Sequence, residues 1–323
     1  MLKAYRTELA PTLRQEQKIR RALGIVRYLY NSYIDRNRRL WHMYSRGQLD
    51  SSQQRFLTAY DYDKYVNRVL KEKQPWIGEC GSKARKKALM NAEAAFRRFF
   101  RGQGGFPRYK KRCRQGVKLY FPRSNPKDWR VEEGRVMIPT LGLVRLKERD
   151  YLPRGQRVLS GTVSRVADRY FVSLVVEIEE DSPLNRDREI GRKPLGAPLS
   201  LSLGGADFAA TPVRRYPGPP GQERLSRLEG RLARAIRSLR RKRRCLKAGQ
   251  EEGANVDKAR LQVQRLALRL ACIREDYENK VVHELVRERP AAIRIEAGQE
   301  AAGYYRFLRK LGRKAEVLGI ELC

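Results

Sequence analysis

The feature that most constrains the fold is a run of short apolar segments between residues 117 and 178. β-branched and aromatic residues dominate each segment, and turn residues separate one segment from the next, which is the pattern of short strands. Strands of this number and length suggest a small barrel. The segments are VKLYF, RVMIP, LVRLK, VLSGTVSRV and YFVSLVVEI.

A helical module precedes these strands. The first segment, LKAYRTELA, predicts a strand that Pro11 ends, and Thr12 with Gln15 forms a capping box that opens a helix. A further helix is expected from Ser82 to Phe100, so that the module spans residues 12–103. Apolar residues recur every three or four positions on the first helix, which predicts one buried face: Ile19, Leu23, Val26, Tyr30 and Tyr33.

The second half of the chain begins with a polar stretch, EEDSPLNRDREIGRKPLGAP, that we expect to be a linker. The next stretch, LSLSLGGADFAATP, alternates apolar and polar residues up to a Gly-Gly turn and predicts two strands. A helical hairpin follows, with one apolar stripe from Leu225 to Leu239 and the other from Val263 to Leu285. Between Arg214 and Lys247 there are 13 basic residues against two acids, an excess that an apolar seam does not explain.

The charge of the chain indicates a polyanionic partner. There are 71 Lys and Arg against 36 Asp and Glu, a formal net charge of +35, and the basic residues lie among aromatics in every segment. No apolar run approaches the roughly 20 residues of a membrane span, and the N-terminus has no signal-peptide pattern, so we expect a cytoplasmic protein. The five cysteines are scattered, which argues against a zinc site. The chain has only two histidines, so catalysis by imidazole groups is not expected.

The strongest candidate nucleic-acid segment is GGFPRYKKRCR, which follows the first helical module. Arg and Lys would neutralise phosphates there, while Phe106 and Tyr109 would offer faces for stacking; the alternative is a solvated loop. We predict contacts to nucleic acid from this segment, from nearby positions and from the end of the first hairpin helix: Arg108, Tyr109, Lys110, Lys111, Arg112, Arg114, Lys118, Arg123, Arg97, Arg98, Arg241, Lys242, Arg243 and Arg244.

Several segments, in order, resemble TnpB, the family of transposon-encoded RNA-guided nucleases related to compact type V CRISPR effectors. The N-terminal stretch MLKAYRTELAPTLRQEQKIRRALGIVRYLYNSYI is similar to the start of that family. The segments AEAAFRRFFRGQGGFPRYK and VMIPTLGLVRLKER resemble two of its motifs, and the likeness continues through IREDYENKVVHELV, AAIRIEA and YYRFLRKLGRKAEVLGIEL. The resemblance covers nearly the whole chain.

The resemblance implies an α+β multidomain fold. A helical recognition module (12–103) would be inserted in an oligonucleotide-binding wedge barrel (1–11 and 104–190), and a C-terminally truncated, RNase H-like RuvC domain without a zinc ribbon would span 196–323. The first RuvC acid of the family aligns with Ser202, and the second matches Glu296. The third acid would follow GIELC, where the sequence stops.

On this alignment we expect no cutting of DNA, because serine is a poor Mg²⁺ ligand and Glu296 alone cannot hold two metal ions. Asp207, beyond the Gly-Gly turn, is not expected to reach the same point. The implied function is that of the nuclease-dead, TldR-type members. Such a protein, with no metal and no cofactor besides a guide RNA, binds double-stranded target DNA next to a short flanking motif and represses transcription by blocking RNA polymerase. Two alternatives remain: an RNA-guided endonuclease with a rearranged metal site, or a decayed remnant with nonspecific affinity.

The helix from Ser82 to Phe100 is the expected reader of the flanking motif. With Leu89, Ala92 and Phe96 buried, its basic and amide side chains lie on or near the opposite face. Asn can bond adenine and Lys can donate to guanine, and the alternative is that these side chains touch only phosphate. The predicted readers are Lys83, Lys86, Lys87 and Asn91, with Tyr60 and Tyr62 as helpers.

Overall fold

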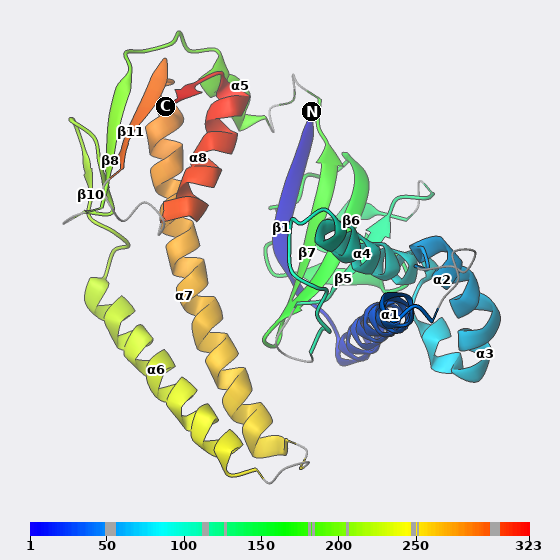
Figure 1. The fold of residues 1–323 in the computed structure, drawn as a ribbon. Coiled ribbons are helices and arrows are strands. Elements are labelled where there is room, and N and C mark those ends of the chain that lie inside the picture. The colour runs from blue at the N-terminus through cyan, green and yellow to red at the C-terminus, as the bar shows by residue number, and fades with distance from the viewer. Residues whose placement is uncertain are drawn as a thin grey trace. The chain divides into compact units, whose positions relative to one another are not determined.

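The computed structural model describes residues 1–48, 56–111, 116–125, 128–179, 182, 185–204, 207–246, 250, 252–297 and 304–323. The chain divides into two compact units, Met1–Ile178 and Glu179–Cys323. Both units combine helices with a β-sheet, so the fold is mixed α/β (Figure 1). The predicted domain limits at residues 103, 104, 190 and 196 stay predictions.

The first unit is built on a seven-stranded sheet of order β2-β6-β7-β1-β5-β4-β3. The N-terminal strand β1 lies in the middle of this order, antiparallel to both β7 and β5, although the helices separate it from them in sequence. The strands are β1 (Leu2–Ala10), β2 (Lys118–Pro122), β3 (Arg130–Glu132), β4 (Arg135–Ile138), β5 (Gly142–Leu146), β6 (Arg157–Val166) and β7 (Arg169–Glu177).

All five predicted strand segments are present, but the predicted closed barrel is not confirmed. The hydrogen-bonded order has two edges, β2 and β3, and no pairing joins these two strands within the described residues. Strand propensity and turn spacing predict individual strands. Closure of the sheet into a barrel depends on pairing between strands distant in sequence, which short-range patterns do not reveal.

The helices of the first unit lie between β1 and β2 in sequence. Thr12 and Gln15 form the predicted capping box, with each side chain bonded to the other residue's backbone N–H, so the long helix α1 starts where the sequence predicts. The predicted helix at Ser82–Phe100 is also confirmed. The helical elements are α1 (Leu13–Ser45), α2 (Ala59–Tyr65), η1 (Val66–Leu70), α3 (Lys71–Lys73), η2 (Pro75–Glu79) and α4 (Ser82–Phe100).

Buried charge ties β1 into this sheet. The Glu8 carboxylate, 7% exposed, accepts hydrogen bonds from Lys147 (2.6 Å) and from Arg169. Burial raises the pKa of Glu8, but the hydrogen bonds and charges of these two partners outweigh it, and the net shift is below the usual value. The pair of cations thus holds Glu8 ionised in the sheet.

The second unit contains a five-stranded sheet of order β10-β9-β8-β11-β12, in which β8, β11 and β12 run parallel. Its elements are α5 (Arg186–Gly191), β8 (Leu199–Leu203), β9 (Ala209–Ala210), β10 (Arg215–Tyr216), α6 (Gln222–Arg244), α7 (Ala254–Arg287), β11 (Ala292–Ala297), α8 (Tyr305–Leu318) and β12 (Glu321–Leu322).

One expectation for the second unit is wrong. The stretch predicted as a linker includes the short helix α5, which packs against α8 and contributes Ile190 to the core of this unit. An ion pair between Asp187 and Lys314 of α8 also holds the helix, and the polar composition of the segment reveals neither contact. A truncated RuvC domain is not confirmed as such, although the predicted strand, turn and helical hairpin are all present.

The helices α6 and α7 form a long hairpin that extends from the sheet (Figure 1). The two helices pack through a buried apolar cluster formed by Leu228, Ala235, Leu266 and Leu270. The other faces of α6 carry polar residues, most of them arginine. None of the described helices is long and apolar enough to cross a membrane.

Candidate nucleic-acid interface

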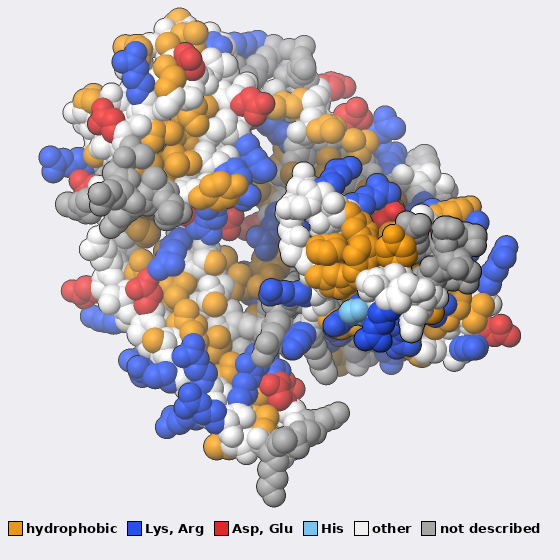
Figure 2. Space-filling view, viewed as in Figure 1, with side chains coloured by type: hydrophobic (Ala, Val, Ile, Leu, Met, Phe, Trp, Pro, Cys, Tyr) orange, Lys and Arg blue, Asp and Glu red, His pale blue; other side chains and the backbone are white. Residues whose placement is uncertain are grey.

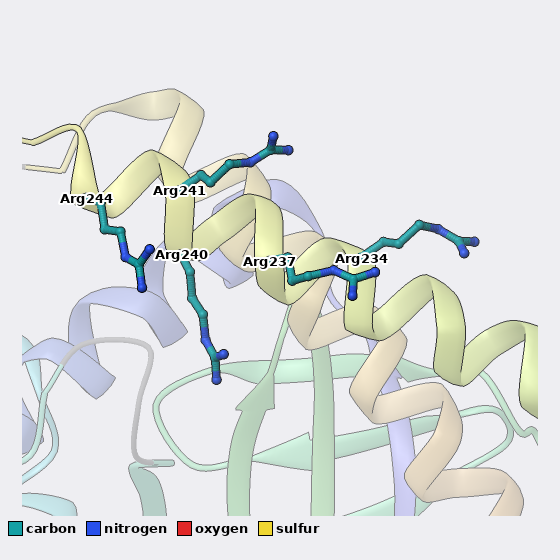
Figure 3. Close-up of a pocket in the computed structure, with 5 residues that line it drawn as sticks. All are labelled: Arg234, Arg237, Arg240, Arg241 and Arg244. Carbon is teal, nitrogen blue, oxygen red and sulfur yellow. The ribbon is translucent and has the colours of Figure 1, made fainter.

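Five arginines of the second unit form a positive surface on α6. Arg234, Arg237, Arg241 and Arg244 follow one another at spacings of three, four and three, which places them along one face of the helix, and Arg240 lies beside them. All five are exposed and together line an open hollow of about 530 Å³ (Figure 3). We call these five residues the arginine face.

The arginine face has no acidic counterpart. None of its five guanidinium groups forms an ion pair or hydrogen bond within the described residues, whereas Arg227 on the same helix pairs with Glu223 at 2.9 Å. Each unpaired arginine offers five donors in a planar fork that matches phosphate. Because like charges on one face repel, the arrangement favours a polyanion that spans several of them.

The predicted positions on α6 only partly coincide with this surface. Arg241 and Arg244 belong to the arginine face, but Arg243 forms an ion pair with Glu252 at 3.0 Å and Lys242 donates to the Asn255 carbonyl at 3.5 Å. The prediction rests on the contiguous basic run at the helix end. It omits Arg234, Arg237 and Arg240, although their three- and four-residue spacing is a visible signal in the sequence.

The segment GGFPRYKK is anchored to the helical module and is not a free basic strand. Asn31 bonds both backbone groups of Lys110, at 2.7 and 3.0 Å, and the Tyr109 hydroxyl donates to Asp35 at 3.1 Å. The Lys110 ammonium lies 4.0 Å from the centre of the Tyr30 ring, and burial lowers the pKa of that ammonium. Phe106 packs against Phe96 and Phe99.

These contacts engage Tyr109 and Lys110, while most of the other predicted positions near this segment remain at the surface. Arg108 and Lys111 are exposed, as are Arg98 and Lys118, and Arg123 is half-buried. Arg97 is bonded to Glu93 at 2.8 Å. Arg112 and Arg114 lie outside the described residues.

The expected motif readers on α4 are mostly at the surface. Lys83, Lys86 and Asn91 are exposed, and the Lys87 ammonium lies 5.2 Å from the centre of the Tyr120 ring. Leu89, Ala92 and Phe96 are buried, as the helical period predicts.

The two tyrosine helpers differ from each other. Tyr60 is 58% exposed and has Lys64 and Lys86 over its ring, at 4.5 and 5.5 Å from the centroid. Tyr62 is only 3% exposed, and its hydroxyl bonds Ser32 at 2.6 Å. The place of Tyr62 is thus in the core and not in a groove of DNA. Its burial depends on the tertiary packing of α2, which the local pattern does not reveal.

The two positions that the resemblance aligns with acids of the family, Ser202 and Glu296, are neighbours. Ser202 on β8 and Glu296 on β11 are opposite one another in the parallel register, and both are exposed. Residues in parallel register project from the same face of a sheet, so the hydroxyl and the carboxylate share one side. The Ser202 hydroxyl donates to the Ala210 carbonyl at 3.3 Å.

A magnesium pair, as the family resemblance implies, needs several carboxylates around one point. No group of three His, Cys, Asp or Glu side chains suited to a metal occurs within the described residues, and Glu296 faces a serine there. The described residues alone therefore do not fit a two-metal centre, and we derive no metal-dependent step from them.

Comparisons with known proteins agree with the resemblance. Residues 1–46 match a family described as a helix-turn-helix domain, HTH_OrfB_IS605; in this structure they form β1 and α1. An Escherichia coli (strain K12) protein named "Putative RNA-guided DNA endonuclease InsQ" is 26% identical over 290 residues, which cover 87% of this chain and 62% of that protein. A Streptomyces pristinaespiralis protein named "Putative RNA-guided DNA endonuclease" is 27% identical over 294 residues, or 90% of this chain and 66% of that protein.

Among solved structures, a chain from a Cas12f1–sgRNA–target DNA complex is similar, with a TM-score of 0.49 and 10% identity, over 100% of this chain and 88% of that chain. This chain spans less than two thirds of the length of the two curated relatives.

The names of the relatives correct one expectation. From the sequence we expect a catalytically dead protein that is not an enzyme, but both curated relatives are named as RNA-guided DNA endonucleases, which contradicts that expectation. The narrower TldR assignment is not shown by these comparisons. What the sequence likenesses support is a broader statement: residues 1–46 match the HTH_OrfB_IS605 family, and most of the chain is similar to two proteins named as RNA-guided DNA endonucleases.

Proposed function

We propose that this protein binds a guide RNA and, through base pairing of that RNA, a double-stranded DNA target next to a short flanking motif. The single observation that carries the proposal is the arginine face of α6, five exposed guanidinium groups with no acidic partner in the described part of the chain. The net charge of +35 and the names of the two curated relatives support it.

The chemistry of this surface suits the backbone of a nucleic acid and not the edges of bases. From Arg234 to Arg244 the helix rises about 15 Å, at roughly 1.5 Å per residue, so the face is long enough to meet several phosphates. Guanidinium groups bound to phosphate fix position without reading sequence. Sequence would then be read by the guide, and the protein would supply the cationic surface.

The test is to purify the full chain from its host and to sequence the RNA that accompanies it. We expect one discrete RNA species, and we expect the complex to shift a DNA duplex that matches this RNA but not a scrambled duplex. Protein that carries only random fragments, or that shifts both duplexes equally, would contradict the proposal. A salt titration would then separate specific from nonspecific affinity.

Binding of the complex to DNA would also affect transcription. A complex bound at a promoter would exclude RNA polymerase, so binding would suffice to repress transcription from that site. A reporter gene whose promoter matches the guide checks this part of the proposal, since its transcript should fall only when guide and protein are both present. The cytoplasmic location and the domain limits expected from the sequence belong to the same proposal.

DNA cleavage is a second candidate function, favoured by the names of the two relatives. The described residue that would serve it is Glu296, exposed on β11. Incubation of the RNA complex with matched duplex and Mg²⁺ tests it, since a guide-dependent cut product is expected. The matched control is Glu296→Gln, which should lose the product and keep the affinity for DNA. If the wild-type complex yields no product, this second candidate is wrong and binding alone remains.

A further inference from the structure

A group of aromatic side chains is exposed on the helical module, far in sequence from α6. Trp41 and Tyr44 come from the last turns of α1, and Phe99 and Phe100 end α4. We call these four residues the aromatic surface cluster. Phe100 is 48% exposed and the other three are half-buried. Figure 2 shows a hydrophobic area over this side of the first unit with basic side chains around it.

The rings of the cluster form a continuous surface. Trp41 lies 5.4 Å from Phe100, 6.4 Å from Phe99 and 6.0 Å from Tyr44, measured between ring centroids. Phe99 and Phe100 are 5.5 Å apart. From beneath, Phe56 and Phe96 support Phe100 at 5.7 and 6.1 Å. The exposed rings therefore rest on fixed neighbours and need little ordering before they bind a flat partner.

Two arginines lie close to these rings along the chain. Arg101 is the C-cap residue directly after Phe100, and on α1 Arg38 lies one turn before Trp41. Arg38 and Arg101 are exposed and form no ion pair with the part of the chain that the structure describes. The negative end of a helix dipole explains basic residues in the last turn of α4, but it does not explain exposed aromatics beside them.

We propose that the aromatic surface cluster binds an unpaired nucleic-acid strand by stacking bases on its rings, while the neighbouring arginines bond the phosphates. Aromatic faces beside cations are the combination that single-stranded nucleic acid requires, and stacking needs no particular base. We assign the bound strand to DNA, and this assignment rests on the proposed function. A guide that pairs with one strand of a duplex leaves the other strand of DNA unpaired.

The experiment measures the affinity of the full chain, without guide RNA, for a labelled oligo-dT of about ten nucleotides by fluorescence anisotropy. Phe100→Leu removes the π-face and keeps an apolar side chain, and it should weaken binding about fivefold to 150-fold. Phe100→Tyr should bind like the wild type. The slope of log K against log salt should not change for Phe100→Leu, because every arginine that neutralises a phosphate is still present.

Met90→Ala is the matched control, because Met90 lies on the same helix and is 47% exposed. It should bind oligo-dT like the wild type. Equal affinity of Phe100→Leu and wild type, or an equal weakening in Met90→Ala, would overturn the proposal. So would a weakening confined to oligo-U, which would assign the surface to RNA. Since no guide is present, a failure of guide-directed binding would leave this result unaffected.

Discussion

At the scale of single residues, the packing of Trp129 and Leu174 leaves no room for a side chain at position 161. Gly161 lies on β6 opposite Phe121 and Leu174, and an added Cβ would lie 2.2 Å from the Trp129 ring. Gly161→Ala should therefore destabilise the protein by about 1–3 kcal/mol, the usual cost of overpacking, as a lower urea midpoint. The control is Gly24→Ala in α1, where nothing lies within 4 Å; it should stabilise by roughly 0.5–1 kcal/mol. Wild-type stability of Gly161→Ala would show that Trp129 moves aside freely.

At the scale of elements, α6 allows a comparison of free and paired arginines on one helix. Replacing Arg237 and Arg241 by Gln should weaken nucleic-acid binding and flatten the slope of log K against log salt by about 0.7–0.9 for each phosphate that is no longer neutralised. Arg227→Gln is the matched control, because Arg227 is already paired with Glu223 at 2.9 Å and lies outside the arginine face. An unchanged slope in the double variant, or the same change in Arg227→Gln, would show that the arginine face does not bind phosphate.

At the scale of the whole molecule, the net charge of +35 predicts self-repulsion in the free protein. Salt shortens the range of that repulsion, to about 10 Å at 0.1 M, so the melting temperature should rise between low and moderate NaCl. Scanning fluorimetry measures it. A variant with Arg234, Arg237 and Arg241 all replaced by Gln removes three of these charges and should show a smaller rise. A melting temperature that falls as salt is added would mean that ion pairs such as that of Glu8 outweigh the repulsion.

Local patterns in the sequence were enough to predict the longest helices and the strands of the first sheet from Val117 onward. The Thr12 capping box, the helix Ser82–Phe100 and the two apolar stripes of the α6–α7 hairpin are all confirmed. Each depends on residues at most a few positions apart, so the chain specifies it without reference to the rest of the fold. The helix α5 is not predicted, because its polar stretch is ordered by distant partners: Ile190 lies in the core of the second unit, and Asp187 pairs with Lys314 of α8.

The sequence by itself determined the charge, the start of α1, the bounds of α4 and the family resemblance of this protein. Tertiary structure alone decided which basic and aromatic side chains remain available to a partner. Lys110 and Tyr62 carry suitable side chains, yet Asn31, Tyr30 and Ser32 hold them from elements distant in sequence. Tertiary structure also decides that β2 and β3 are the edges of the first sheet and that Ser202 lies opposite Glu296 in the second. Such contacts depend on which distant segments pack together. The free energy of that packing comes from the whole fold, so no short stretch of the chain predicts it.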